Sequence, residues 1–579
     1  AGFGQFIIVM VFLPVFALTG VEGKMFIPMA STFAIAVLAA FILSFTTAPA
    51  LASLFLSGRT SDKEPRLMSW IRRAYIPAFE WSYKRARLTM VLAVASVLLG
   101  IGLFMTRGAE FLPQLGEGSF AFHMIRPVNA SLTQSVEFQK KADVVVETFT
   151  EVDHVFSRIG TSEVATDPMG VNVSDTYIML KPRSEWPKVN DSKRSYQELT
   201  DALLEKLNRE LPGQTYLASQ PIQMRFNELL EGTRADVAVK IFGPDLDKLV
   251  EYAKKTQEVI SKVKGAGDVE VDLAGTSPVL RIEPNESNLT KYNASISDVL
   301  DSISIALGGE EAGFLYEAEK KFPIVVRLDN EARSDLETIR ELPVGIGSNT
   351  IVPLKNLATI GFKETYGSVN RENSNRRTAV LINLRGRDTE SFVKEAQESV
   401  AREVKLPDGY YFEWGGNFKN LEQARSRLMI LAPLALILVL MMVYAAFGSI
   451  GETLLIFACV PMSLVGGVIG LILNGLPFSI SAGIGFIALS GIAVLNGVVL
   501  VNFFNQLKAE GKTGKELVLQ GTLVRLRPVM MTALVAVFGF IPMMISTGVG
   551  AEVQKPLASV VIGGIISSTL LTLIVLPVV

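Results

Sequence analysis

The sequence is poor in the residues that enzymes most often use for catalysis. Its 579 residues include one cysteine and two histidines. One cysteine permits no disulfide within the chain and no thiolate metal cluster, and so few histidines leave little scope for the nucleophile–base pairs of hydrolases. Charged residues make up only 19%, and the formal net charge of -2 gives no indication of nucleic-acid binding. We therefore expect no enzyme, no bound cofactor and no nucleic-acid partner.

Charge is also missing from long stretches of the chain. Hydrophobic residues reach 49%, and the longest charge-free run covers residues 453–507. Runs of about 20 apolar residues without charge are typical of transmembrane helices, whereas buried helices of a soluble protein would explain one such run but not eight. The sequence predicts eight spans, near 4–18, 28–52, 89–106, 428–446, 454–473, 480–505, 529–547 and 556–579.

The two ends of the chain are copies of each other. Residues 1–51 align with residues 529–579 without a gap at an offset of 528, with 11 identities in 51 positions. The aligned residues include three prolines and a Thr-Gly-Val: Pro14 with Pro542, Thr19-Gly20-Val21 with Thr547-Gly548-Val549, Pro28 with Pro556, and Pro49 with Pro577. Apolar composition alone would not keep these in register, so we infer an internal duplication, as in many transporters.

The period of the repeat predicts a larger protein. Two full repeats of this period need about a thousand residues, so we expect the chain to be the C-terminal part of such a protein. Six of the predicted spans lie within one period, residues 52–579. We therefore expect twelve spans in two parallel halves when the protein is complete.

Basic residues in short loops predict the orientation. Lys and Arg dominate residues 57–88 and residues 506–528, so we place both loops in the cytoplasm and residues 107–427 on the opposite side of the membrane. Aromatic residues alternate with Arg and Lys at 66–87. This pattern favours a helix lying on membrane lipid at the cytoplasmic interface, and the alternative is a plain basic linker.

Between the third and fourth spans the chain is too polar for the bilayer. Its pattern predicts a first module (107–234) of the order strand, helix, strand, strand, helix, strand, which is the ferredoxin-like order: 119–127, 131–150 with Ser131 as N-cap, 152–159, 174–181, 195–210 and 214–220. A second module (235–427) repeats it with strands at 236–242, 268–273, 278–284, 378–385 and 410–415 and helices at 246–262, 295–307 and 389–403. We expect an inserted subdomain at about 308–376. The fold class is thus a polytopic α-helical membrane protein with α+β modules.

Several motifs make the chain similar to a known family, the resistance–nodulation–division (RND) exporters, and within it to the heavy-metal branch of the cobalt–zinc–cadmium type. The motifs are EFLPQ at 110–114, EG at 117–118, TDP at 166–168, LKP at 180–182, ELLEGTRADVAVK at 228–240, NLRGRD at 383–388, FGS at 447–449, ALSGIAVLNG at 488–497 and RLRPVMMT at 525–532. The resemblance implies a proton-driven, trimeric exporter in the inner membrane of a Gram-negative cell. It also implies a periplasmic adaptor, an outer-membrane channel, and docking through residues 308–376.

The resemblance also points to a site for the transported cation. The copper and silver branch binds its ion through three methionines, and the matching positions here are His123, Val173 and Glu228. Soft sulfur suits Cu(I) and Ag(I), whereas carboxylate and imidazole suit divalent ions such as Zn(II) and Co(II). The departure from methionine therefore favours a divalent cation as substrate.

Candidate ligands are His123, Asp167, Asp175, Glu228, Glu231 and Asp236. Glu228 lies where the family has a ligand, and Glu231 shares its face if the segment is helical; otherwise Glu231 is a solvated acid. His123 lies on a strand, where a structural role is the alternative. Asp167 precedes a proline, so a turn-forming role competes with ligation.

Proton coupling is harder to place, because the predicted spans contain no charged residue. An ionisable group inside a span is usually functional, and the family's membrane-buried acids would precede this chain. In drug exporters of the family a Lys interacts with those acids, and here Leu495 occupies the position of that Lys. Asn496 and Thr532 are the remaining candidates for the proton pathway, with helix packing as the alternative. We interpret the glycines at 466, 467 and 470 as close-packing sites.

These observations favour a proton-driven RND exporter of divalent heavy-metal cations. One alternative is an RND exporter of organic drugs or lipids, for which aromatic residues rather than convergent acids would line the binding site. Another is a membrane receptor or assembly factor that does not transport.

Overall fold

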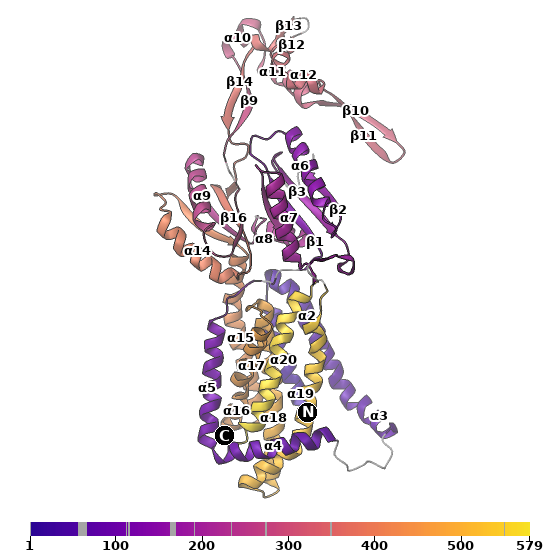
Figure 1. Cartoon of the computed structure of the whole chain (residues 1–579), viewed down its shortest axis with the longest axis vertical. Helices are drawn as coiled ribbons and strands as arrows, with labels where there is room; N and C mark the ends of the chain where they lie inside the picture. Colours follow the sequence, from indigo (N-terminus) through magenta and orange to yellow (C-terminus); the bar gives the residue numbers. More distant parts are fainter. Residues whose placement is uncertain are drawn as a thin grey trace.

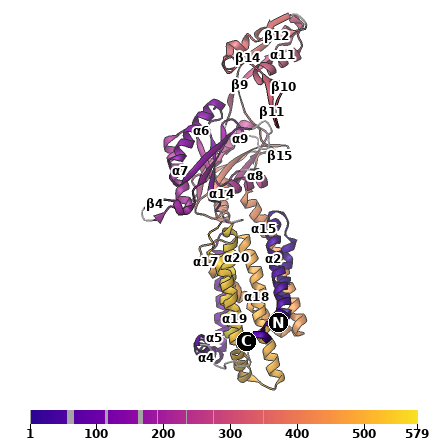
Figure 2. The ribbon, with the colours of Figure 1, turned by 90° about the vertical axis from the view of Figure 1, so that its right-hand side faces the viewer.

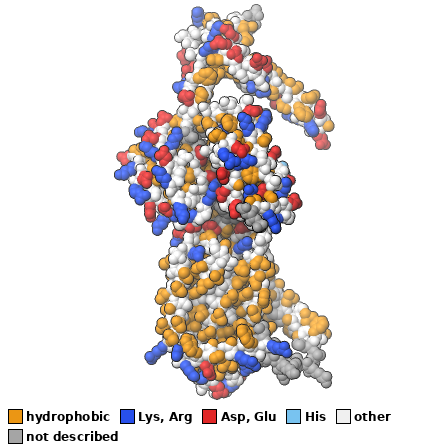
Figure 3. Space-filling view, viewed as in Figure 1, with side chains coloured by type: hydrophobic (Ala, Val, Ile, Leu, Met, Phe, Trp, Pro, Cys, Tyr) orange, Lys and Arg blue, Asp and Glu red, His pale blue; other side chains and the backbone are white. Residues whose placement is uncertain are grey.

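The molecule has three levels stacked along its longest axis (Figure 1). The computed structural model describes residues 2–55, 66–111, 113, 116–161, 169–189, 192–232, 234–272, 275–347, 350–548 and 550–579. A bundle of helices forms the lowest level, mixed helices and sheets the middle one, and a small elongated subdomain the top (Figure 2). Hydrophobic side chains cover the visible face of the bundle, and charged side chains gather above it and at its base (Figure 3).

Seven helices among the described residues are long and apolar enough to cross a membrane. They are α2 (Gly20–Phe45), α5 (Ala86–Met105), α15 (Asn417–Phe447), α16 with α17 (Ile450–Phe457 and Cys459–Leu473), α18 (Ile480–Ala509), α19 (Gly514–Ile545) and α20 (Ala551–Ile574). The segment predicted as a span near 4–18 is a shorter apolar helix, α1 (Gly2–Phe12), followed by a 3-10 turn, η1 (Leu13–Ala17). Pro14 lies in the first turn of η1, where its missing N–H ends the regular α-helical bonding.

The second predicted span, 28–52, has different ends in the structure. Helix α2 begins at Gly20, ahead of the predicted start, and its first-turn acid Glu22 is buried and accepts a hydrogen bond from Arg427 Nη1 at 3.1 Å. It ends at Phe45, and a separate helix α3 (Thr47–Phe55) follows. Pro49 cannot donate to the carbonyl of Phe45, so the break falls one turn before the proline.

The repeated ends of the chain have similar surroundings. Helices α1 and α19, which correspond in the repeat, both pack against α18. The second helix of each copy contains the corresponding proline, Pro28 in α2 and Pro556 in α20. A glycine with positive φ precedes or begins each of these helices, Gly20 at +72° and Gly550 at +83°.

Helices α17 and α20 cross at backbone contact distance, in agreement with the interpretation of the glycines at 466 and 470 as close-packing sites. A Cβ on Gly470 would lie 2.3 Å from the carbonyl oxygen of Ser559, and one on Gly466 would lie 2.2 Å from that of Gly563. These separations are far below van der Waals contact, so only glycine permits the crossing.

Helix α4 (Arg66–Lys84) lies across the base of the bundle (Figure 1). One face carries Tyr75 and Phe79, both buried against α19 and α20, and the Tyr75 hydroxyl donates to the carbonyl of Leu573 at 2.8 Å. The side chain of Trp70 is 69% exposed. Lys515 lies 4.0 Å from Glu80, so the two basic loops lie at the same end of the bundle.

The first module of the middle level has one four-stranded antiparallel sheet. Its elements are β1 (Ser119–Ile125), α6 (Leu132–Glu147), β2 (Val152–Ile159), β3 (Val173–Leu180), η2 (Arg183–Glu185), a small hairpin of β4 (Lys188–Val189) and β5 (Ser192–Lys193), α7 (Tyr196–Glu210), β6 (Thr215–Ser219) and α8 (Pro221–Glu231). The strand order is β2-β3-β1-β6. Ser131 is the N-cap of α6, as predicted, and accepts from the backbone N–H of Gln134 at 3.2 Å.

The second module repeats this arrangement. Strand β7 (Val237–Phe242), helix α9 (Leu246–Ile260), strands β8 (Ala266–Val271), β15 (Arg371–Glu372) and β16 (Asn375–Leu384), helix α14 (Thr389–Glu403) and strand β17 (Tyr411–Gly416) follow in order. The sheet order is β15-β16-β7-β17. Strand β8 lies outside this order and also pairs with β16. A small apolar cluster that includes Leu217, Ala235 and Leu381 joins the two modules.

The top subdomain is larger than predicted. The strand expected at 278–284 in the second sheet is β9 (Ser277–Pro284), and it pairs with β14 (Ala358–Thr365) outside that sheet. That expectation was wrong, because the strand that pairs with β8 in the second sheet is β16, and β9 pairs with β14 instead. Between β9 and β14 lie α10 (Glu286–Tyr292), α11 (Ile296–Ile303), η3 (Ser304–Gly308), β10 (Glu310–Glu317), β11 (Lys320–Val326), α12 (Asn330–Ser334), α13 (Leu336–Arg340), β12 (Pro343–Ile346), β13 (Thr350–Pro353) and η4 (Leu354–Asn356).

Candidate metal centre

Two of the predicted ligands face each other across neighbouring strands. His123 on β1 and Asp175 on β3 are direct cross-strand partners, so their side chains lie on the same face of the sheet. The histidine Nδ1 lies 2.8 Å from the Asp175 Oδ1, and the two residues are only 7% and 1% exposed. The first module thus carries a buried imidazole–carboxylate pair.

The charges around this pair determine which nitrogen carries the proton. Burial would raise the pKa of Asp175, but the hydrogen bond from His123 and the positive charge of Arg234 outweigh it and lower that pKa to about 2. Burial lowers the pKa of His123, so the imidazole is neutral at pH 7. An ionised Asp175 can only accept, so we assign the proton of His123 to Nδ1. Nε2 is then the basic nitrogen, as in the carboxylate–histidine–metal arrangement of metal sites.

The third member comes from a different element. Glu228 lies on helix α8, which extends to Glu231. The segment is therefore helical, which was the condition for Glu231 to share a face with Glu228. Its Oε2 accepts from Arg225 Nη1 at 2.6 Å, and its Oε1 accepts from Arg234 Nη2 at 3.1 Å. The Glu228 side chain is 18% exposed, so it lies at the edge of the buried pair.

Arg234 joins these groups. Its Nη1 lies 3.0 Å from the His123 Nδ1 and 3.3 Å from its Nε2, 3.4 Å from the Asp175 Oδ1 and 3.1 Å from the sulfur of Met169. The side chain of Arg234 is only 12% exposed. One guanidinium therefore contacts nitrogen, oxygen and sulfur donors from β1, β3, α8 and the segment before β3.

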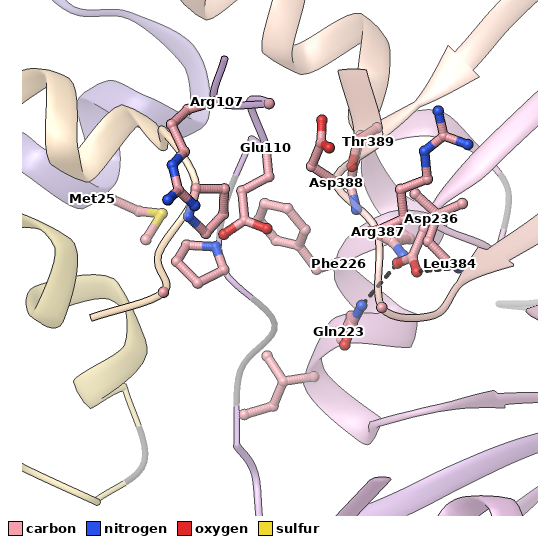
Figure 4. A pocket seen from close by; sticks show the side chains of 18 of the residues that line it. Met25, Arg107, Glu110, Gln223, Phe226, Asp236, Leu384, Arg387, Asp388 and Thr389 are labelled. Atoms are coloured by element: carbon pink, nitrogen blue, oxygen red, sulfur yellow. Dashed lines mark hydrogen bonds between the residues drawn. The ribbon is translucent and has the colours of Figure 1, made fainter. Parts of the chain in front are cut away.

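A second group of acids lines a cavity of about 770 Å³ between the bundle and the modules (Figure 4). Glu110, Asp236 and Asp388 line it, together with Arg107 and Arg387. Burial raises the pKa of Glu110 to about 7, and the negative charges of Asp388 and Asp236 add to the effect. Burial also raises the pKa of Asp236. The cavity therefore contains carboxyl groups that resist ionisation.

The wall of this cavity joins the membrane helices to the second module. The linker after α5 exchanges backbone hydrogen bonds with the α17–α18 loop: Phe478 N donates to Gly108 O at 3.1 Å and Glu110 N donates to Phe478 O at 3.0 Å. The carboxylate of Asp388 occupies the space of a Cβ on Gly108, 2.0 Å from that position. Asp388 also caps α14 by accepting from Ser391 N at 2.9 Å. Membrane helices and module are thus held together at one point.

The sequence pattern of the AcrB/AcrD/AcrF family matches residues 3–579. The chain belongs to that family. Its membership confirms the RND resemblance and the membrane-helix fold with mixed helix and sheet domains, and the chain is a multi-pass membrane protein.

Relatives within the family are metal-efflux proteins. The cation efflux system protein CzcA of Alcaligenes sp. (strain CT14) is 45% identical over 582 residues, covering 100% of this chain and 54% of that protein. The nickel and cobalt resistance protein CnrA of Cupriavidus metallidurans is 42% identical, covering 99% of this chain and 54% of that protein. A crystal structure described as a heavy metal efflux pump matches with a TM-score of 0.88 and 31% identity, covering 100% of this chain and 57% of that one. The chain spans about half the length of the relatives it matches.

The structure places the predicted site residues in separate groups. His123, Asp175 and Glu228 meet at Arg234, whereas Asp236 lies in the junction cavity, where it accepts from Gln223 Nε2 at 2.9 Å. Asp167 and the side chain of Glu231 lie outside the described residues. Within the described ranges, no three His, Cys, Asp or Glu side chains lie close enough together to hold a metal ion.

The two polar residues predicted for the proton pathway lie in different environments. Asn496 is buried within α18 at 8% exposure. Thr532 is exposed on α19, and its hydroxyl donates to the carbonyls of Pro528 and Val529 in its own helix. These local bonds use the hydroxyl proton of Thr532, and its oxygen can still accept from a donor on another helix.

Sequence reasoning did not identify Arg234 or Glu110 as functional residues. Metal sites are predicted from donor side chains, so a positively charged side chain among them was not expected. Arg234 lies within the 228–240 motif, six residues after Glu228, and that spacing was the available signal. Glu110 follows a charge-free span, and a lone acid beside a membrane boundary was the corresponding signal.

Proposed function

We propose that the complete protein is a proton-driven RND exporter of divalent heavy-metal cations such as Zn²⁺, Co²⁺, Cd²⁺ or Ni²⁺. One observation carries the proposal: the predicted ligands His123 and Glu228, 105 positions apart in the chain, reach the same buried guanidinium. A site that holds one cation with imidazole and carboxylate has the donors that divalent metal ions prefer. The similarity to cation, nickel and cobalt efflux proteins supports the same cargo.

In this proposal the ligands have distinct roles. His123 Nε2 and Glu228 Oε1 bind the ion, and Asp175 fixes the tautomer and orientation of His123 from behind. Sulfur from Met169 adds a softer donor. Asp236, Asp167 and Glu231 remain predicted ligands, the first of them for an ion passing the junction cavity. The metal is the substrate, and no cofactor is required.

The architecture is proposed to be that of a tripartite efflux pump. The chain contributes eight of twelve spans in the inner membrane, with α1 as the shortest, and its two ferredoxin-like modules stand in the periplasm. The strand orders of both sheets support the ferredoxin-like assignment. The top subdomain would contact a periplasmic adaptor and an outer-membrane channel, and the protein would form a homotrimer.

The basal helix α4 supports the proposed orientation. It presents Trp70 outward while Tyr75 and Phe79 anchor it to the bundle. Aromatic and basic side chains at a membrane boundary favour the lipid headgroup region, so we place this end in the cytoplasm. Proton coupling would use acids in the other half of the protein, with Asn496 and Thr532 as hydrogen-bonding partners.

Growth of a metal-sensitised strain tests the function. Cells expressing the full-length protein, either wild type or Glu228→Ala, are compared on salts of Zn, Co, Ni, Cd, Cu and Ag. We expect the wild type to raise tolerance to at least one divalent ion and Glu228→Ala to remove that gain at equal expression. Unchanged tolerance to every divalent ion would contradict metal export. Tolerance to organic compounds instead would favour a drug exporter, and no change with either would favour a receptor.

A further inference from the structure

The place where a metal ion would sit is occupied by part of the protein. Arg234 Nη1 lies against both ring nitrogens of His123, 3.0 Å from Nδ1 and 3.3 Å from Nε2, and Nη2 lies 3.1 Å from Glu228 Oε1. Nε2 and Oε1 are the two atoms that the proposed function assigns to the transported ion. The guanidinium thus lies among the donors proposed for that ion.

The distances show that the two cations cannot share the site. Zinc binds nitrogen and oxygen donors at about 2.0–2.2 Å, whereas the groups around Arg234 lie 3.0 to 3.4 Å from its nitrogens. The separation of the acids and the histidine fits this reading, because no three of them lie within metal-binding reach in the described part of the chain. For an ion to bind, the guanidinium must leave and the donors must close.

Charge leads to the same conclusion. Among the described residues, the carboxylates of Asp175 and Glu228 form ion pairs with three guanidiniums, those of Arg158, Arg225 and Arg234. The side chains of Arg158 and Arg225 are 45% and 48% exposed, so water screens their charges, whereas that of Arg234 is 12% exposed. Arg234 is therefore the charge that a divalent ion would meet directly.

We infer that Arg234 is a tethered competitor for the transported cation: its guanidinium holds the donors when no ion is bound, leaves when a divalent ion enters, and returns to expel it. Export requires binding that can be reversed, and a built-in cation on the same chain supplies the reversal. The competition also favours divalent over monovalent ions, because a monovalent ion gains no charge advantage over the guanidinium it replaces. The inference rests on the proposed export function and adds a residue that controls affinity and release.

Zinc binding by the purified full-length protein in detergent tests the inference, with a fluorescent zinc chelator as competitor. Arg234→Gln removes the competing charge and should tighten Zn²⁺ binding by about tenfold or more, the equivalent of one lost charged hydrogen bond. Arg225→Gln is the matched comparison, because Arg225 also contacts Glu228 but is half exposed, and it should give a smaller gain. Adding Glu228→Gln to Arg234→Gln should abolish the gain. In cells, Arg234→Gln should lower zinc tolerance despite tighter binding, because release is slowed.

Each other outcome decides a different point. Unchanged or weaker Zn²⁺ binding by a folded Arg234→Gln protein, with wild-type binding that Glu228→Gln removes, would overturn the competitor role and leave the export function standing. No Zn²⁺ or Co²⁺ binding by any variant would overturn both. Should Arg234→Gln fail to fold, Arg234→Lys keeps the charge but has one nitrogen in place of the forked guanidinium, so it holds fewer donors at once and should tighten binding by a smaller factor. A Lys variant that binds no more tightly than the wild type would then overturn the inference.

Discussion

The crossing of α17 and α20 makes a prediction that can be worked out from backbone distances. A Cβ on Gly470 would lie 2.3 Å from the carbonyl oxygen of Ser559, about 1 Å closer than an ordinary contact. Because the obstacle is backbone in a facing helix, no rotamer change relieves it. Gly470→Ala must therefore separate the helices along a contact that runs through Gly466 and Gly563.

The size of the effect follows from two opposing terms. Replacing glycine by alanine in a helix interior gains about 1 kcal/mol of helix propensity. Forcing an extra methyl group into a filled contact costs typically ~1–3 kcal/mol, and more when backbone must move. Gly539 on α19 is the matched control, because a Cβ there meets nothing within 4 Å. We expect Gly470→Ala to melt several degrees below the wild type and Gly539→Ala to melt at or above it.

Thermal melting of the full-length protein in detergent, followed by fluorescence-detected size-exclusion chromatography, measures both variants together. Equal melting temperatures for Gly470→Ala and Gly539→Ala would refute the reasoning, because they would show that the helices do not meet at that carbonyl. A Gly470→Ala protein that melts lower but exports normally would limit the crossing to a structural role.

Two further predictions concern pH. The lowered pKa of Asp175, about 2 against an ordinary 3.8, contributes ~2 kcal/mol of stability that is present above about pH 4 and lost as the pH falls through 2. Asp175→Asn should lower the melting temperature at pH 7 and flatten its decline in acid; a variant as stable as the wild type at pH 7 would contradict the buried ion pairs. The raised pKa of Glu110, from 4.5 to about 7, has the opposite sign, so its contribution is present below pH 4.5 and lost as the pH rises through 7. Glu110→Gln should remove the part of the stability loss seen between pH 4.5 and about 7, and an unchanged pH profile would show that Glu110 is solvated.

Local signals in the sequence located most of the elements. Charge-free apolar runs predicted the long membrane helices, because lipid requires every segment that crosses it to be apolar along its whole length. The capping residue Ser131 and the alternating pattern of the strands predicted the first module nearly to the residue. Pairing between distant strands was less accessible: β9 has the pattern of a sheet strand, yet its partner β14 and its exclusion from the second sheet depend on which edge β16 occupies.

The sequence by itself determined the long apolar helices, the family and the types of residue available to a cation. Those properties depend on composition, spacing and similarity, which a linear chain displays. Only the tertiary structure decided which of the candidate ligands meet, because His123, Asp175 and Glu228 come from two strands and a helix whose approach depends on the packing of α8 against β1 within the first module. It also placed Arg234 among them, since a charge acts through space on whatever the fold brings within a few ångströms.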